Sequence, residues 1–153
     1  MLKKIFAPGN DSFCTSFGLF VLRVSFGLTM LLAHGWDKVK EFGKLSSGFP
    51  DPLHVGSPVS LSLSIFAELV CSALLVAGFL TRFAALVCAI NMAVAFFIVL
   101  KGAFGESHNG ELAFIYMAGY AVLLIAGPGK LSMDKAFFSG GGGSKGGGAD
   151  TKR

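Results

Sequence analysis

The sequence predicts an all-α fold: a bundle of four transmembrane helices with both termini in the cytoplasm, followed by a flexible glycine-rich tail. Hydrophobic residues make up 53% of the 153 residues and charged residues only 14%, whereas an average soluble domain has about 25% charged residues. The mean hydropathy is +0.68, and four apolar windows approach the roughly 20 residues that a membrane-crossing helix needs. These values exclude a soluble globular domain and a disordered chain.

The four predicted spans form one domain at residues 1–138. They cover about residues 14–33, 59–80, 83–100 and 108–126. Only Thr81 and Arg82 separate the second span from the third, which favours an antiparallel hairpin, and the fourth span ends at Gly127-Pro128-Gly129, which cannot continue a helix. Residues 130–138 are amphipathic enough to lie on the inner membrane surface. Seven of the 21 glycines fall in residues 139–153, so we assign this tail as disordered.

Basic residues that flank the spans set the predicted orientation, because cytoplasmic connections carry an excess of Lys and Arg. With the N-terminus inside, the inner side holds Lys3, Lys4, Arg82, Lys130, Lys135, Lys145, Lys152 and Arg153, and the outer side holds Lys38, Lys40, Lys44 and Lys101. This excess places both termini in the cytoplasm. The net charge of +4 does not gather into the clustered basic face of a nucleic-acid-binding protein, so we expect no nucleic-acid partner.

Three polar side chains lie near the middle of the predicted spans. Arg23 is in the first span, Glu68 in the second and Asn91 in the third. Because a charge at the centre of a membrane helix costs about 2.5 to 3.5 kcal/mol unless it is paired, we expect an Arg23–Glu68 ion pair with Asn91 hydrogen-bonded to it. Such a cluster either fixes the helix register or binds a ligand or protons, and the residues alone leave both readings open.

The outer half of the bundle is rich in titratable groups, which makes it a candidate entrance. His34 shares a helix face with Arg23, Glu111 lies at the outer end of the fourth span, and Ser60, Ser64 and Glu68 recur at steps of four. That serine stripe is typical of helix packing more often than of a pore. The histidines at 34, 54 and 108 lack the spacing of metal ligands, so no metal site is predicted. The three cysteines at 14, 71 and 88 include no CxxC pair and indicate neither a disulfide framework nor a redox centre.

Several motifs in chain order resemble the DoxX family. They are His34-Gly35-Trp36-Asp37-Lys38, which matches an HG-x-x-K motif, Phe66-Ala67-Glu68-Leu69, Gly78-Phe79-Leu80-Thr81-Arg82-Phe83, Asn91-Met92, Gly110-Glu111-Leu112, and the exit from Ala126 to Asp134. The resemblance covers about Phe17 to Lys135, nearly the whole predicted bundle. By position, Arg23, His34, Lys38, Glu68, Arg82, Asn91 and Glu111 match recurrent polar positions of the family.

This resemblance implies a multi-pass protein of the bacterial inner membrane. The family includes the quinone-linked subunit of a thiosulfate-oxidising membrane enzyme, and other members are grouped with oxidoreductase complexes that handle thiols or oxidative stress. The leading hypothesis is therefore a membrane subunit of an oxidoreductase system, with an outward-opening polar pocket for a quinone headgroup or a small oxidant. Arg23 and His34 would donate hydrogen bonds to carbonyl oxygens, and Glu68 and Glu111 would exchange protons. Catalytic residues stay unassigned.

The sequence carries no flavin, haem or iron–sulfur motif. A quinone would thus serve as a diffusible electron acceptor, and a soluble or membrane oxidoreductase partner would supply the electrons. Two rival functions remain. One is a small-solute or proton transporter, for which four helices are few unless the chain forms a homo-oligomer, and the other is a non-catalytic scaffold that recruits soluble enzymes to the lipid bilayer.

Overall fold

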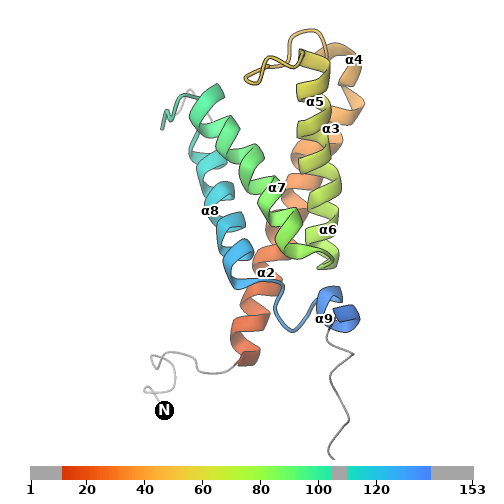
Figure 1. Ribbon diagram of the computed structural model, residues 1–153, viewed down its shortest axis with the longest axis vertical. Coiled ribbons are helices and arrows are strands. Elements are labelled where there is room, and N and C mark those ends of the chain that lie inside the picture. Colours follow the sequence, from red (N-terminus) through yellow and green to blue (C-terminus); the bar gives the residue numbers. More distant parts are fainter. Residues whose placement is uncertain (1–11, 105–109, 139–153) are drawn as a thin grey trace, which may run out of the picture.

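The computed structural model describes residues 12–104 and 110–138, and the regular elements within these ranges are all helices (Figure 1). The first long helix comprises α2 (Ser12–Met30), the π-helical turn η1 (Leu31–Gly35) and α3 (Trp36–Lys40), and the short helix α4 (Phe42–Leu45) follows it. The second comprises α5 (Ser57–Ile65), the π-helical turn η2 (Phe66–Cys71) and α6 (Ser72–Ala77). The third comprises α7 (Thr81–Ala93) and the π-helical turn η3 (Val94–Val99), and α8 (Gly110–Ala126) and α9 (Met133–Phe138) complete the described chain.

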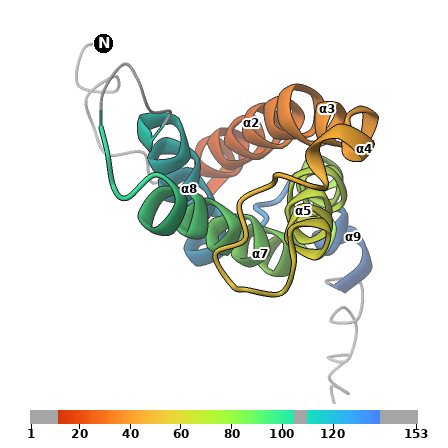
Figure 2. The same cartoon turned by 90° about the horizontal axis from the view of Figure 1, so that it is seen from above.

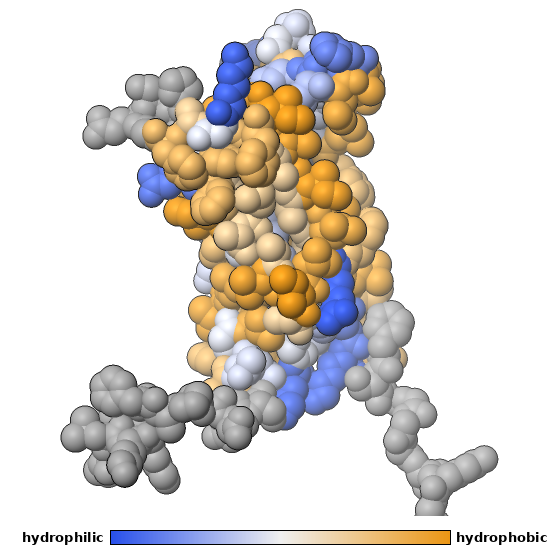
Figure 3. All heavy atoms as spheres, turned by 60° about the vertical axis from the view of Figure 1, so that its left-hand side comes forward, coloured by the Kyte–Doolittle hydropathy of each residue, from blue (hydrophilic) through white to orange (hydrophobic). Residues whose placement is uncertain are grey.

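Three of these helices are long and apolar enough to cross a membrane. They run over Phe13–Lys40, Ser57–Ala77 and Thr81–Val99, with 28, 21 and 19 residues. The fourth apolar helix, α8, has 17 residues, and residue 108, where the sequence predicted its start, lies outside the described residues. Large apolar side chains such as Phe97 and Ile125 are exposed. Figure 3 shows a broad apolar zone on one face of the molecule, with most of the polar groups toward its two ends, which is the kind of surface that a lipid bilayer solvates.

The first helix is longer than the predicted span of residues 14–33, because it continues through η1 and α3 to Lys40. This extension places His34 and Lys38 on a helix, whereas the sequence predicts the end of the span at residue 33 and a connection after it. The turn between the second and third helices lies at Gly78–Leu80, where Gly78 and Leu80 have φ values of +72° and +48°. A left-handed glycine is the usual way to end a helix.

The three long helices share one departure from regular geometry, a π-helical turn in each. A π turn is rare, inserts one residue into the helix, and is frequent at functional sites. η1 contains His34, η2 contains Glu68, and η3 begins three residues after Asn91. All three π turns therefore lie at the level of the polar residues that the sequence singled out.

The first and second helices approach each other closely because glycines line their contact. A Cβ atom on Gly35 would lie 2.8 Å from the carbonyl carbon and oxygen of Glu68, and one on Gly27 would lie 3.0 Å from the carbonyl oxygen of Ser72. Small residues permit this kind of backbone contact between membrane helices. η1 consequently packs directly on η2, which brings the end of the first helix beside Glu68.

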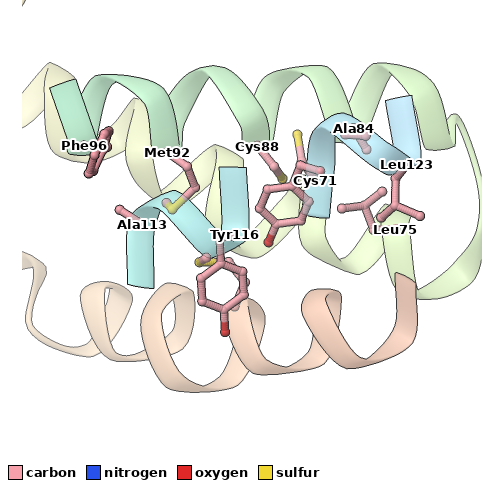
Figure 4. Packing of buried hydrophobic residues seen from close by; sticks show 12 residues of the cluster. Cys71, Leu75, Ala84, Cys88, Met92, Phe96, Ala113, Tyr116 and Leu123 are labelled. Atoms are coloured by element: carbon pink, nitrogen blue, oxygen red, sulfur yellow. The ribbon is translucent and has the colours of Figure 1, made fainter. Parts of the chain in front are cut away.

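The core lies between the second and third helices, α8 and the middle of the first helix. Figure 4 shows its packed residues, among them Cys71, Leu75, Cys88 and Leu123, which are at most 2% exposed. Toward the end that carries α3 and α4, α5 and α7 diverge (Figure 1). The core therefore closes the bundle at the end near α9 and leaves room at the opposite end.

The glycine contact yields a stability prediction. Gly35→Ala should lower the free energy of unfolding by about 1 to 3 kcal/mol, the usual cost of overpacking, because the new methyl group meets rigid backbone of η2. Gly18→Ala in α2 is the matched control, since a Cβ at Gly18 meets nothing within 4 Å, and it should be neutral or slightly stabilising. Reversible unfolding in mixed detergent micelles measures both. Equal stabilities of the two variants would contradict the close packing of η1 on η2.

Candidate functional site

A cavity of about 770 Å³ occupies the space between the diverging helices. Its walls come from the three long helices, from α8, and from Phe49, Pro50, Pro52 and Leu53 of the connection between α4 and α5. This connection passes over α5 and α7 in Figure 2. Most lining side chains are apolar, and the polar ones gather from different helices. The polar lining residues are His34, Lys38, Ser60, Ser64, Glu68, Asn91 and Tyr116.

Glu68 is the centre of the polar wall. Lys38 Nζ contacts both of its carboxylate oxygens in an ion pair, and the Glu68 side chain is only 4% exposed whereas that of Lys38 is 23% exposed. Ser64 Oγ donates to Glu68 Oε1 at 3.0 Å, and Asn91 Nδ2 donates to the same oxygen at 3.1 Å. A buried carboxylate is tolerated when paired and hydrogen-bonded in this way. Four helical segments, α3, α5, η2 and α7, thus meet at one carboxylate.

The sequence places these groups through helical spacing and the glycine contact. Lys38 follows His34 by four residues and Ser64 precedes Glu68 by four, so each pair shares one helix face. Lys38 Nζ also donates to Ser64 Oγ at 3.0 Å and lies 5.6 Å from the centre of the Phe49 ring. The ammonium group is therefore held from three directions and faces the cavity with Glu68.

Aromatic ring contacts connect His34 with α8. The ring of Tyr116 on α8 lies 6.2 Å from that of His34 in an edge-to-face arrangement, and it stacks on Tyr120 at 6.0 Å. Phe26 contacts both tyrosine rings, at 5.2 and 6.1 Å. These contacts fix the position of His34 at the cavity margin, since edge-to-face ring pairs add about 0.5 to 1.5 kcal/mol each.

The connection above the cavity is shaped by Asp51. Its carboxylate accepts hydrogen bonds from the backbone N–H of Val55 at 3.1 Å, the backbone N–H of Gly56 at 2.7 Å and the hydroxyl of Ser60 at 2.7 Å. The Ser60 hydroxyl, followed by the two backbone donors, lowers the pKa of Asp51 below its ordinary value of 3.8. Gly56 directly precedes α5, so Asp51 ties the connection to the start of that helix.

The expected Arg23–Glu68 ion pair is wrong. The Arg23 guanidinium is 1% exposed and donates to the carbonyl oxygens of Pro128 and Leu131, at 3.2 and 2.7 Å. The side chain of a helical residue leans toward the helix N-terminus, which carries the guanidinium toward the end of the bundle near α9 and away from the cavity. Glu68 takes Lys38 instead, because the first helix continues beyond His34 to Lys40 and so carries Lys38 four residues after His34.

Asp134 attaches the segment after α8 to the turn that precedes α7. The Asp134 carboxylate accepts hydrogen bonds from the backbone N–H groups of Leu80 and Thr81, at 2.7 and 2.9 Å, and so caps α7. The Asp134 N–H donates to Gly78 O at 2.9 Å. Arg23 and Asp134 together fasten α9 across the closed end of the bundle.

The remaining predicted groups lie outside the polar wall. Glu111 is exposed at the start of α8 and does not line the cavity. His54 is exposed in the α4–α5 connection, and His108 falls outside the described residues. Within residues 12–104 and 110–138, no group of three or more His, Cys, Asp or Glu residues is arranged to hold a metal ion.

The sequence did not predict two features, one in the cavity and one in the core. The first is the role of Tyr116 and Phe49 in the cavity, because aromatic residues are common throughout this chain. The second is the contact of two buried thiols, since Cys71 and Cys88 face each other across the second and third helices (Figure 4). Cys88 Sγ also donates to the carbonyl oxygen of Ala67 at 3.2 Å. The spacing of 17 residues between the cysteines gave no signal for this contact.

The fold and the site define a helical membrane protein with a buried ion pair in a largely apolar cavity. The chain belongs to the DoxX family, whose family model matches residues 18–101. This match covers the three long helices and the polar cluster around Glu68. Arg23, His34, Lys38, Glu68 and Asn91 lie inside the matched range, and Glu111 lies outside it.

Relatives of the chain include two uncharacterized proteins of Haemophilus influenzae. One is 32% identical over 114 residues, which are 71% of this chain and 83% of the relative. The other is 30% identical over 102 residues, which are 65% of this chain and 68% of the relative. No solved structure matches the chain.

Double-mutant cycles distinguish the Lys38–Glu68 ion pair from the Arg23–Glu68 pair that the sequence predicted. Lys38→Met and Glu68→Gln should show a coupling energy of about 1 to 3 kcal/mol, as contacting residues do, whereas Arg23→Met and Glu68→Gln should be additive within about 0.5 kcal/mol. Detergent-based unfolding of the single and double variants provides the values. Coupling of Glu68 to Arg23 in place of Lys38 would refute the observed pairing.

The three hydrogen bonds that the Asp51 carboxylate accepts predict that the stability of the folded protein depends on pH in the acid range. Because the pKa of Asp51 is lower in the folded state, its contribution is complete above pH 3.8, the ordinary value, and is lost as the pH falls through the lower folded value. The difference in melting temperature between the wild type and Asp51→Asn should thus be constant from neutral pH to about pH 5 and shrink below about pH 4. A difference that grows on acidification would contradict the cap.

Proposed function

We propose that this DoxX-family protein is a quinone-linked membrane subunit of an oxidoreductase system, and that the cavity beside Glu68 is its quinone headgroup site. One observation carries the proposal: a Lys–Glu ion pair forms one wall of an otherwise largely apolar cavity of about 770 Å³ in a membrane helix bundle. The opposite charges of Lys38 and Glu68 cancel, which suits a neutral headgroup better than an anion. Apolar walls with a few placed polar groups are typical of small-molecule sites.

The apolar part of the cavity suits the body of a lipid-soluble ligand. Leu63 and Phe66 of the second helix and Ile90 of the third line the cavity and are 52%, 42% and 54% exposed. Their exposure favours an opening of the cavity beside these two helices. An isoprenoid tail can stay in the bilayer while the polar ring lies at the ion pair.

The residues divide the chemistry between them. A bound quinone accepts two electrons and two protons and becomes the quinol. His34 is positioned to donate a hydrogen bond to a carbonyl oxygen. The three N–H groups of Lys38 are held by Glu68 and Ser64, so Lys38 donates to a second carbonyl oxygen only when the ligand displaces one of these contacts, and Glu68 is the carboxylate that gives or takes a proton. Asn91 and Ser64 hold Glu68 in place through their hydrogen bonds to Oε1. The electrons come from an oxidoreductase partner, because the sequence carries no flavin, haem or iron–sulfur motif.

This proposal changes the set of site residues. His34, Lys38, Glu68 and Asn91 line the cavity, and we assign them to the ligand. Arg23 fastens the segment after α8 and is assigned a structural role. Glu111 keeps no role in the cavity.

We further propose the bacterial inner membrane as the location, with both termini cytoplasmic. The excess of basic residues near α9 and in the chain termini supports this orientation. The open end of the cavity, with α3 and α4, then faces the outer side. Trp36 on α3 is half-exposed and lies 5.8 Å from Lys40 Nζ, a composition that suits a membrane interface.

A proton-coupled transporter is the second candidate, because the buried Glu68 carboxylate is also the kind of group that proton-driven carriers use. Proteoliposomes separate the two functions. Quinone-independent proton flux that is lost in Glu68→Gln would favour transport. Recruitment of soluble enzymes to the membrane that is unchanged in Glu68→Gln would favour a non-catalytic scaffold.

The quinone site is tested by ligand binding. A short-chain ubiquinone analogue should bind the purified protein in nanodiscs saturably, and Lys38→Met combined with Glu68→Gln should weaken this binding about tenfold or more, because a hydrogen bond from a charged donor contributes about 1.5 to 3 kcal/mol. The double variant avoids an unpaired buried charge. Calorimetric titration measures the dissociation constant.

Ser62→Ala is the matched control for this titration. Ser62 lies on α5 but is exposed and donates to the carbonyl oxygen of Pro58, so its loss should leave binding unchanged. Absence of saturable binding to the wild type, or wild-type binding by the double variant, would overturn the proposal.

A further inference from the structure

The cavity wall contains a row of hydrogen-bonding groups that leads from the α4–α5 connection to Glu68. We propose that Asp51, Ser60 and Ser64 form a proton path that connects Glu68 with the water at the open end of the bundle. The inference rests on the proton-exchanging role of Glu68 in the proposed function and adds the route and the side from which its proton comes.

The outer end of the path is a direct hydrogen bond. Ser60 Oγ donates to Asp51 Oδ1 at 2.7 Å. Asp51 belongs to the connection outside the membrane helices and is accessible to water, whereas Ser60 is only 8% exposed and lines the cavity. The ionised Asp51 carboxylate can therefore collect a proton from solvent and pass it to a group that solvent hardly reaches.

The inner end is a second direct hydrogen bond. Ser64 Oγ donates to Glu68 Oε1 at 3.0 Å, and Ser64 is 6% exposed. Ser60, Ser64 and Glu68 follow each other at steps of four residues, which places them on one face of the second helix. Both serines line the cavity. The two hydrogen-bonded ends are thus four residues apart, a rise of about 6 Å along the helix, which a single water molecule in the cavity can bridge.

The proton balance of the path is simple. A hydroxyl group donates one hydrogen bond and accepts others. The Ser60 hydroxyl, which donates to Asp51 in the structure, first turns its hydrogen toward the cavity. Each serine then accepts one proton from the group on its outer side and releases its own to the group on its inner side. One proton leaves water at Asp51, and one proton is added to Glu68 when the site requires it. The serines return to their starting state once their hydroxyl groups rotate back.

Other charged and titratable groups face the two ends of the path. Lys38 on α3, His34 on η1 and Tyr116 on α8 share the cavity with Glu68, and His54 acts electrostatically on Asp51. Lys38 Nζ donates to Glu68 and to Ser64, but an ammonium group has no acceptor and cannot relay a proton without first losing one. The serine hydroxyls both donate and accept hydrogen bonds, which favours proton transfer through Ser60 and Ser64 over transfer through Lys38.

Time-resolved infrared spectroscopy after photorelease of protons tests the path in the full-length protein in nanodiscs. The carboxyl band of Glu68 is assigned by its loss in Glu68→Gln. In Asp51→Asn and Ser60→Ala, the rise of this band should be about tenfold slower or more, as expected for loss of a positioned proton-transfer group. Ser62→Ala, on the exposed side of α5, should match the wild type.

The outcomes keep this inference separate from the quinone site. Wild-type rates in both Asp51→Asn and Ser60→Ala would overturn the path and assign proton entry to the side of Lys38 and His34, while quinone binding by the same samples would leave the proposed function intact. Slowed protonation of Glu68 in the variants of a protein that binds no quinone would support the proton path and contradict the quinone site. The rates are measured well below the melting temperature of each variant, so that the stability lost with the Asp51 contacts does not account for a slow rate.

Discussion

The burial of the Glu68 carboxylate is the constraint on which the rest of the structure depends. A charge among membrane helices is costly unless it is paired and hydrogen-bonded, and no single helix can supply all of the required partners. Lys38 comes from the first helix, Ser64 from one turn earlier on the second, and Asn91 from the third. Satisfying one carboxylate therefore fixes the rotation of three helices about their axes and their relative height.

The contact at Gly35 is the steric counterpart of this electrostatic requirement. Lys38 reaches Glu68 because η1 packs against η2 with backbone almost touching backbone. A larger residue at position 35 would separate the helices and lengthen the distance between ammonium and carboxylate. The glycine of the HG-x-x-K motif and the lysine of the same motif thus serve one purpose, and their spacing of three residues follows from the helical pitch.

The sequence predicted apolar helices and singled out Glu68 and Asn91, which the structure brings together, but it did not predict the ion-pair partner of Glu68. Helical periodicity and the scarcity of charge identified Glu68 and Asn91, and the family motif identified His34 and Lys38. The pairing depends on where the first helix ends. Hydropathy places this end too early, because residues 36–40 are polar at three of five positions. The destination of Arg23 depended on the backbone carbonyl groups of Pro128 and Leu131, and contacts to backbone leave no pattern in a sequence.

The π turns have a consequence for how this chain can vary. Each π turn accommodates one residue more than a regular helix would hold, so deletion of a single residue from η2 would restore an α-helix and rotate everything before it by about 100° relative to everything after it. Ser60 and Ser64 would then leave the side of the bundle on which Cys71 and Leu75 are buried. The two halves of the second helix are thus in different rotational phases, and the length of six residues between Phe66 and Cys71 is as much a part of the site as the side chains that line it.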